Sequence, residues 1–299
     1  MTFRTLRSAL RPALLPALLP ALALLLAVPL PAAAHDFWLR PSSFRMDAPG
    51  GQVVRFEVGH PSERSPWPLT PWRTVSFLSH GPDGVRDQQA GVPEADEPLA
   101  GRGAARVRLD APGAHIVAFE GRIARSDLPA GEFLDYARKE GLTPILARHE
   151  GRDDAGVETY SRRGKAYVRV GDARVGEAEN AGDESHLTEP LGHTLELVPG
   201  VDPTRLEPGG TLPLTVLWQG EPLAGARVSF GPIGDTAGAD GERGAERSDE
   251  DGRVAFEVPM AGEWMAHVIW SRVLPENSGT VGDADYDTVF SSLSFAVED

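Results

Sequence analysis

The residue with the most specific chemistry in this chain is His35, which directly follows the small residues Ala32, Ala33 and Ala34. Ala32 and Ala34 fit the small-x-small pattern of a signal-peptidase site, so cleavage there leaves histidine as the first residue. A terminal amine and an imidazole on one residue chelate copper or nickel near neutral pH, because the amine has an ordinary pKa of about 7.7–8.0. The sequence therefore predicts a metal ligand at His35; the alternative is a terminal histidine without a role.

Residues 1–34 have the organisation of a cleavable export signal. They carry Arg4, Arg7 and Arg11, followed by an apolar stretch from Pro12 to Leu30 that several prolines interrupt, with no charged flank that would stop transfer. This pattern predicts export rather than a membrane anchor. The chain contains no cysteine, which excludes a lipid-anchored N-terminus and any disulfide. We expect a periplasmic protein that is held together by burial, hydrogen bonds or metal.

The chain has eight histidines, and none forms the closely spaced pair that is typical of a zinc-protease helix. Any metal site must therefore be assembled by the fold. His267 lies within the apolar run Trp264–Trp270, and His115 alternates onto the same face as Val117. A buried histidine needs a hydrogen-bond partner or a metal, so each of these two is either a core residue or a ligand.

His60 and Asp285 are further candidates to complete such a site. His60 follows Gly59 at the end of a predicted strand, where ligands are commonly presented, although most loop histidines are simply solvated. Asp285 belongs to an acidic cluster before the last predicted strand, where a carboxylate either binds a cation, orients an imidazole or only solvates a loop. The remaining histidines that we predict on the surface are His80, His149 and His186.

Motifs for enzymatic chemistry are missing from the sequence. It contains no G-x-S-x-G elbow, no phosphate-binding glycine loop, no dinucleotide fingerprint and no cysteine nucleophile. We therefore predict a protein that is not an enzyme and has no catalytic residues.

The elements that must position these residues are mostly strands. One helix is predicted over Leu128–Gly141, with Pro129 in its first turn and Gly141 as its C-terminal stop. Period-2 alternation, interrupted by Gly, Pro, Asp and Asn, predicts eleven strands. These are Gln52–Val58, Arg73–Ser79, Ala105–Leu109, Ala114–Glu120, Lys165–Val170, His193–Val198, Thr211–Trp218, Ala226–Phe230, Arg253–Val258, Trp264–Trp270 and Thr288–Val297.

The predicted fold class is mainly β, with two β-sandwich domains of immunoglobulin-like or transthyretin-like type and one short helical insertion. We expect an N-terminal β-rich domain over residues 35–185, with the helix near 128–141, and a C-terminal sandwich over residues 190–299. Such folds say little about chemistry by themselves.

The charge of the chain limits its partners. The formal net charge is −15, and removing the three arginines of residues 1–34 changes it to about −18. Such a field repels nucleic acid and anionic membrane surfaces and attracts cations. The acidity is also consistent with a role in solubility alone.

Three parts of the sequence together resemble a known family. They are His35–Leu39 with Pro41–Phe44, Gly192–Pro199 with Asp202–Pro203, and Asp285–Phe295. The chain resembles the exported domain-of-unknown-function family described as periplasmic components of cobalt/nickel ABC-type transport systems. The resemblance spans nearly the whole mature chain. It implies a periplasmic, β-rich protein that handles a divalent transition metal, and it implies no catalytic residues.

The leading hypothesis is a periplasmic metal-binding protein, for nickel or cobalt with copper next, which captures or delivers the ion for an envelope transporter. His35 would bind through its amine and imidazole, His267 and His115 come next, and His60 or Asp285 would complete the site. One alternative is an adhesion or carbohydrate-binding β-sandwich in which the histidines are structural. The other is a histidine-brace copper oxidase that acts on a polymer.

Two tryptophans bear on the choice between these hypotheses. Trp67 and Trp72 belong to the proline-rich loop around Pro66–Pro71, and their exposure would favour either alternative, because sugars stack on aromatic faces. Packing within a compact surface loop is the competing interpretation.

Overall fold

Strands make up most of the chain in the computed structural model, which describes residues 36–60, 63–171, 184–234, 244–275 and 283–299. Two compact units are distinguished, Met1–Pro31 and Ala32–Asp299, and every described residue belongs to the second. His35, the leading candidate ligand, lies outside the described residues.

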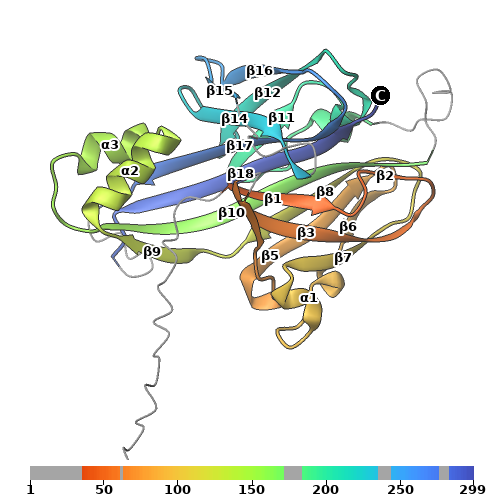
Figure 1. The fold of residues 1–299 in the computed structure, drawn as a ribbon, viewed down its shortest axis with the longest axis horizontal. Helices are drawn as coiled ribbons and strands as arrows, with labels where there is room; N and C mark the ends of the chain where they lie inside the picture. Colours follow the sequence, from red (N-terminus) through yellow and green to blue (C-terminus); the bar gives the residue numbers. More distant parts are fainter. Residues whose placement is uncertain (1–35, 61–62, 172–183, 235–243, 276–282) are drawn as a thin grey trace, which may run out of the picture. The chain divides into compact units, whose positions relative to one another are not determined.

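A ten-stranded sheet, called the middle sheet below, runs through the second unit (Figure 1). Its main path is β15 (Gly244–Arg247), β14 (Arg227–Pro232), β17 (Gly262–Val273), β18 (Tyr286–Val297), β10 (Gly156–Val170), β8 (Gly113–Gly121), β5 (Thr74–Gly81) and β6 (Gly84–Asp87). The short strands β2 (Arg45–Met46) and β9 (Ala124–Leu128) also pair with β10. The β10–β18 pair is parallel, whereas β17 and β18 are antiparallel over their full length.

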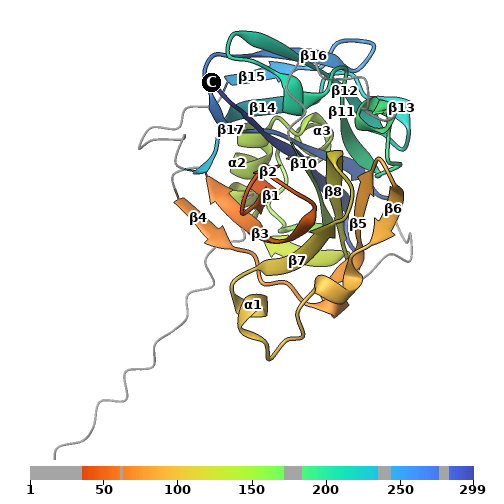
Figure 2. The same cartoon turned by 90° about the vertical axis from the view of Figure 1, so that its right-hand side faces the viewer.

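Two four-stranded sheets lie against this middle sheet. The first contains β1 (Asp36–Pro41), β3 (Gly50–His60), β4 (Glu63–Pro66) and β7 (Ala104–Leu109). The second contains β11 (Leu195–Pro199), β12 (Gly210–Trp218), β13 (Glu221–Pro222) and β16 (Arg253–Val258). Figure 2 shows β12 and β16 on one side of β8 and β10, and β3 and β7 on the other.

Side-chain alternation explains this layering. On β8, Ile116 and Ala118 belong to the core with the second outer sheet, whereas Val117 and Phe119 belong to the core with the first. Successive residues of a strand point to opposite faces, so a strand that is apolar at every position is buried on both sides. The middle sheet is therefore shared by two face-to-face sandwiches.

The two longer helices cover one end of the middle sheet. These helices, α2 (Ala130–Glu140) and α3 (Thr143–His149), pack with Ile269 of β17 and Phe290 of β18 in a third core (Figure 1). Gly141 ends α2 in the left-handed region, at a φ of 69°, where a side chain would be strained. The remaining helical segments are α1 (Pro98–Gly101) and the 3₁₀ helices η1 (Pro71–Arg73), η2 (Gln89–Gly91), η4 (Ser185–Thr188) and η5 (Pro203–Arg205).

The prediction of a mainly β fold with a short helical insertion is confirmed. Every predicted strand overlaps a strand of the structure, and the predicted helix corresponds to α2. The prediction of His149 on the surface is wrong, because His149 ends α3 and its side chain is fully buried against Phe133 and Tyr286. The sequence analysis did not predict α3, a seven-residue helix with a proline in its first turn, and therefore did not predict that His149 is buried.

Strands from both sides of the predicted domain boundary share the middle sheet. β5, β8 and β10 precede that boundary, β14, β17 and β18 follow it, and the β10–β18 pair joins the two groups. No helix in the described part of the chain is long and apolar enough to cross a membrane.

Candidate functional site

Five polar residues from four elements gather where β1 begins, and we call this group the N-terminal junction. Its members are Asp36 of β1, His60 of β3, Lys139 and Glu140 of α2, and His267 of β17. Sequence reasoning named only the two histidines as site residues. Nothing in the local sequence indicated that the last turn of α2 would approach β1 and β17.

The pair Asp36–His267 is the best-defined contact of the junction. The Nδ1 atom of His267 lies 2.9 Å from Oδ1 of Asp36, and the two residues are only 2% and 6% exposed. His267 lies between Met265 and Ile269 on the same face of β17. Met265 belongs to the core with the first outer sheet, and Ile269 belongs to the core with α2 and α3. A carboxylate in this position accepts the Nδ1–H bond and directs Nε2 as the electron-pair donor of the neutral ring.

The last turn of α2 adds one cation and one carboxylate to the junction. The Nζ atom of Lys139 lies 3.1 Å from Nε2 of His60, so the neutral imidazole accepts a hydrogen bond from the ammonium group. Burial raises the pKa of Glu140, and the nearby His267, Lys139 and Arg227 oppose that rise. The junction therefore combines nitrogen and oxygen donors in partly desolvated surroundings, which is the donor set that divalent transition metals take when thiolates are absent.

The strand register places His60 beside the start of β1. Asp36 pairs with Gly59 in the antiparallel β1–β3 ladder, and His60 is the next residue of β3. His35 directly precedes Asp36 in the sequence and lies outside the described residues. Within the described residues, no group of three or more histidines, aspartates or glutamates is arranged to hold a metal ion.

His115 lies in another part of the molecule. β17 and β8 are separated by β18 and β10, and three strand spacings of about 4.8 Å keep their backbones roughly 14 Å apart at least. The ring is 2% exposed, and its Nε2 atom lies 2.8 Å from the carbonyl oxygen of Ala111. Burial lowers the pKa of His115, and its ring fills the space beside Gly81, where a Cβ atom would meet Nδ1 at 2.1 Å.

Asp285 is also distant from His267. His267 pairs with Ser292, and Asp285 comes seven residues earlier in the chain, one residue before β18 begins. At roughly 3.3 Å per residue the separation along the strand direction is about 20 Å. A carboxylate oxygen of Asp285 lies 4.0 Å from Arg152. His60 and His267 are therefore brought to one junction, whereas His115 and Asp285 are not.

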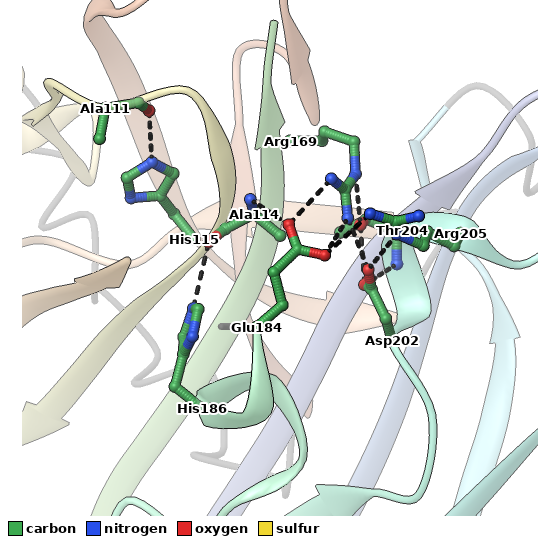
Figure 3. Close-up of polar contacts among 9 residues, drawn as sticks. All are labelled: Ala111, Ala114, His115, Arg169, Glu184, His186, Asp202, Thr204 and Arg205. Atoms are coloured by element: carbon green, nitrogen blue, oxygen red, sulfur yellow. Dashed lines mark hydrogen bonds and ion pairs between the residues drawn. The ribbon is translucent and has the colours of Figure 1, made fainter. Parts of the chain in front are cut away.

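A second polar cluster joins β10 to the segments that precede and follow β11 (Figure 3). Arg169 of β10 is 1% exposed, and its guanidinium contacts Glu184 at 3.1 Å, Asp202 at 2.5 Å and the Thr204 hydroxyl at 2.9 Å. Arg205 contacts the same two carboxylates. Two cations and two anions balance, and each guanidinium nitrogen of Arg169 has a partner. The cluster therefore holds the chain together and offers no free group to a ligand.

Figure 3 also shows how this cluster continues toward β8. Glu184 accepts the backbone N–H of Ala114, and a ring nitrogen of His186 lies 3.1 Å from the carbonyl oxygen of Ala114. These contacts tie the start of η4 to the beginning of β8. His186 is half-buried, and the contact of its ring nitrogen is with a backbone carbonyl oxygen.

A third buried group consists of Lys165, Glu196 and His193. Lys165 and Glu196 are each 1% exposed, and the Nζ–Oε1 distance is 2.8 Å. Burial and the positive charge of Lys165 lower the pKa of His193 to about 3, so its ring is neutral at physiological pH. Its Nδ1 atom is buried and has no hydrogen-bond partner among the described residues. Glu196 and Lys165 satisfy each other, which makes this group a core ion pair.

Comparison with known families gives one match. Residues 32–272 match the family model described as a domain of unknown function, DUF4198. None of the curated proteins matches the sequence.

Several solved structures align with most of the chain. The D0-D1 domain of intimin is 13% identical and aligns with 87% of this chain and 97% of its own, with a TM-score of 0.19. A two-domain fibronectin type III segment from chicken tenascin is 11% identical and aligns with 89% of this chain and 100% of its own, with a TM-score of 0.20. These TM-scores are too low to carry an argument about function.

Proposed function

We propose that this chain, which belongs to the DUF4198 family of domains of unknown function, binds a divalent transition metal at its processed N-terminus. The observation that carries the proposal is the N-terminal junction itself. Asp36 is buried against His267, and it pairs with Gly59, whose neighbour is His60. The start of β1 therefore lies in a region that contains two imidazoles, those of His60 and His267.

His35 would supply the donors that the described residues lack. Its amine and imidazole form a chelate once residues 1–34 are removed, and His60 or His267 adds a third nitrogen. His60 and His35 are each one peptide bond away from a residue of the Asp36–Gly59 pair, so both have the reach to meet one ion. His115 and Asp285 have no part in this site.

The donor set favours nickel, cobalt or copper over magnesium or calcium. Imidazole and amine nitrogens suit the later divalent transition metals, whereas magnesium and calcium prefer oxygen ligands. Copper would bind a given set of nitrogen donors more tightly than nickel or cobalt, so availability decides which ion is carried. The net charge of −15 increases the local concentration of any cation.

The biological role that fits this chemistry is capture or delivery of the ion in the periplasm for an envelope transporter. The metal would be cargo, and the proposal includes no catalytic step. Export depends on the leader of residues 1–34, whose removal also creates the amine ligand. Processing and metal binding would therefore be linked.

The test is a titration of Ni²⁺, Co²⁺ and Cu²⁺ into metal-free protein that begins at His35. One strong equivalent should bind, release protons and raise the unfolding temperature. His35→Ala should abolish that equivalent. An added alanine before His35 should weaken it almost as much, because the extension converts the amine into an amide and leaves the imidazole unchanged.

His186→Gln is the matched control, since it removes an imidazole outside the junction and should leave binding unchanged. If His35→Ala and the extended protein both bind like the parent, the N-terminal site is wrong. A parent that binds none of the three ions more tightly than about micromolar, roughly −8 kcal/mol, would be too weak for a dedicated carrier.

A further inference from the structure

A shallow groove lies where β5 begins, β8 ends and β9 begins beside β10. Thr74 pairs with Gly121, and Ala124 pairs with Tyr160, so the segment Gly121–Ala124 links these two strand pairs and lines the groove. The groove has a volume of about 100 Å³. We call it the Trp72 groove, and its aromatic and charged lining is Trp67, Trp72, Arg73, Arg122, Tyr160 and Arg162.

Aromatic rings form one part of this lining. Trp72 is 65% exposed, which is unusual for so large an apolar side chain. Trp67 is half-buried, and its ring packs against Phe37 at 5.4 Å and Phe119 at 5.7 Å between centroids. The core therefore fixes Trp67, while Trp72 presents its surface to solvent.

Arginines form the other part. The guanidinium of Arg73 lies 5.1 Å from the ring centroid of Trp72 and 5.6 Å from that of Trp67, and Arg162 lies 4.8 Å from that of Tyr160. Among the described residues, neither these two arginines nor Arg122 forms an ion pair with a carboxylate. The Nε atom of Arg162 is buried, and within the described part of the chain it has no hydrogen-bond partner.

This concentration of unpaired cations contrasts with the rest of the chain. The formal net charge is −15, and most other described arginines contact a carboxylate, as Arg163 does with Glu120 and Arg125 with Asp127. No carboxylate is among the described residues that line the groove. Guanidinium groups that stack on aromatic rings keep their N–H donors directed sideways, where a planar carboxylate binds in bidentate fashion.

We propose that the Trp72 groove binds a carboxylated sugar, such as one uronic-acid unit of an acidic polysaccharide. The exposed indole offers an apolar face for a sugar ring, and the arginines offer donors for its carboxylate. A volume of about 100 Å³ is too small to enclose a ligand of drug size, but it fits a single ring of a polymer that continues over the surface.

Charge density favours this occupant over other polyanions. A uronic-acid polymer carries one charge per sugar ring, whereas duplex DNA carries one per about 1.7 Å and would be repelled more strongly by the acidic remainder of the protein. A neutral sugar would use the indole but would leave the guanidinium groups of Arg73 and Arg122 without a counter-charge. This second site is separate from the proposed metal site and does not depend on it.

The experiment is calorimetric titration of metal-free protein with trigalacturonic acid, and in parallel with its neutral methyl ester. The acid should bind, binding should weaken as salt is added, and the ester should bind at least about tenfold more weakly. Trp72→Ala and Arg73→Gln should each lower the affinity for the acid about tenfold or more. Neither Trp72 nor Arg73 is buried, so both variants should keep the fold. Circular dichroism and the unfolding temperature should therefore match those of the parent.

Met260→Ala and Arg108→Gln are the matched controls, because they remove an exposed apolar side chain and an exposed arginine elsewhere. Equal binding of acid and ester would overturn the role of the arginines. Parent-like affinity in both Trp72→Ala and Arg73→Gln would overturn the site. Binding to phosphatidylglycerol vesicles without binding to the trisaccharide would replace the sugar by a membrane surface.

Discussion

The carboxylate of Asp36 and the imidazole of His267, 2.9 Å apart, tie the first described residue of the chain to the middle sheet. Both side chains are buried, so this contact fixes where the chain enters β1. It also fixes the tautomer of His267, because Nδ1–H is the proton that a carboxylate accepts. Carboxylates that orient an imidazole in this way are a common second layer around bound metals.

Asp36→Asn tests whether this orientation matters for metal binding. The change keeps the shape of the side chain and removes its charge, so the basicity of His267 should fall. We expect affinity for Ni²⁺ or Cu²⁺ to drop about 10- to 100-fold while the fold is retained. The measurement is a competition titration against a chelator of known affinity, on protein that begins at His35.

Asp110→Asn is the control for Asp36→Asn, because it removes a carboxylate of a surface ion-pair group with Arg86 and Arg108. Its affinity should equal that of the parent. Unchanged affinity in Asp36→Asn would mean that His267 has no part in the metal site and that the pair is purely structural.

Lys139→Met should increase metal affinity. The ammonium of Lys139 donates a hydrogen bond to Nε2 of His60 at 3.1 Å. A metal ion must displace this ammonium before His60 can bind the ion through Nε2. Lys139 is exposed, and its replacement should cost little stability. We expect affinity to rise several-fold in the same competition titration, since a competing partner and a repelling charge are both removed.

Arg138→Met serves as the comparison, because it removes the neighbouring positive charge of α2, whose partners are Asp135 and Glu150. It should change affinity much less than Lys139→Met. If the two variants behave alike, only the general field of the protein is involved and His60 is not a ligand.

The strands and the main helix could be predicted because their patterns are local. On β16, alternating exposed and buried residues over Arg253–Val258 match the period of a strand on one face of a sheet. Gly141 ended the predicted helix at the residue where the structure has a left-handed C-cap. β1 was not predicted, because Phe37, Trp38 and Leu39 are all buried and show no alternation.

The candidate site could be predicted only in part, because its members are far apart in sequence. His60 and His267 were chosen for their chemistry, and Asp36, Lys139 and Glu140 joined them only through the packing of β1 against β17 and α2. The parallel β10–β18 pair, which joins residues 158–166 to 286–294, likewise has no local signature. Long-range pairing is a property of the whole fold.

Glu158 should make stability depend on pH. It is 4% exposed, and burial raises its pKa from 4.5 to about 7, although Thr288 donates a hydrogen bond to its carboxylate. The folded state therefore keeps a proton that the unfolded state releases between pH 4.5 and 7. Stability from this group falls as pH rises through that range, by about 3 kcal/mol in total.

Glu158→Gln isolates this effect, since glutamine does not titrate. Urea unfolding measures the free energy of unfolding at pH 5 and pH 8. Relative to the parent, the free energy of unfolding of the variant should be about 2–3 kcal/mol higher at pH 8 than at pH 5.

His193, whose pKa is lowered to about 3, has the opposite effect on stability below pH 6.5, and this effect is common to both proteins. Glu120→Gln, at a half-buried ion pair with Arg163, should show a smaller change. A constant difference between variant and parent at both pH values would contradict the raised pKa.

The buried pair Lys165–Glu196 should respond unequally to removal of its two partners. Besides Lys165, the carboxylate of Glu196 accepts backbone N–H bonds from Leu191, Gly192 and His193 at 2.7, 2.9 and 3.1 Å. Lys165→Met therefore leaves Glu196 with three donors and should cost about 1–2 kcal/mol. Glu196→Gln leaves the ammonium of Lys165 buried without a counter-charge and should cost about 3–5 kcal/mol.

Urea unfolding at pH 7 measures both variants, with the exposed pair Arg253–Asp251 as the reference. Arg253→Met should change stability by less than about 0.5 kcal/mol, because exposed ion pairs contribute little. The ordering of the two buried variants decides the argument. If Lys165→Met is the more destabilising change, the backbone donors do not compensate Glu196, and the ion pair alone holds β10 to β11.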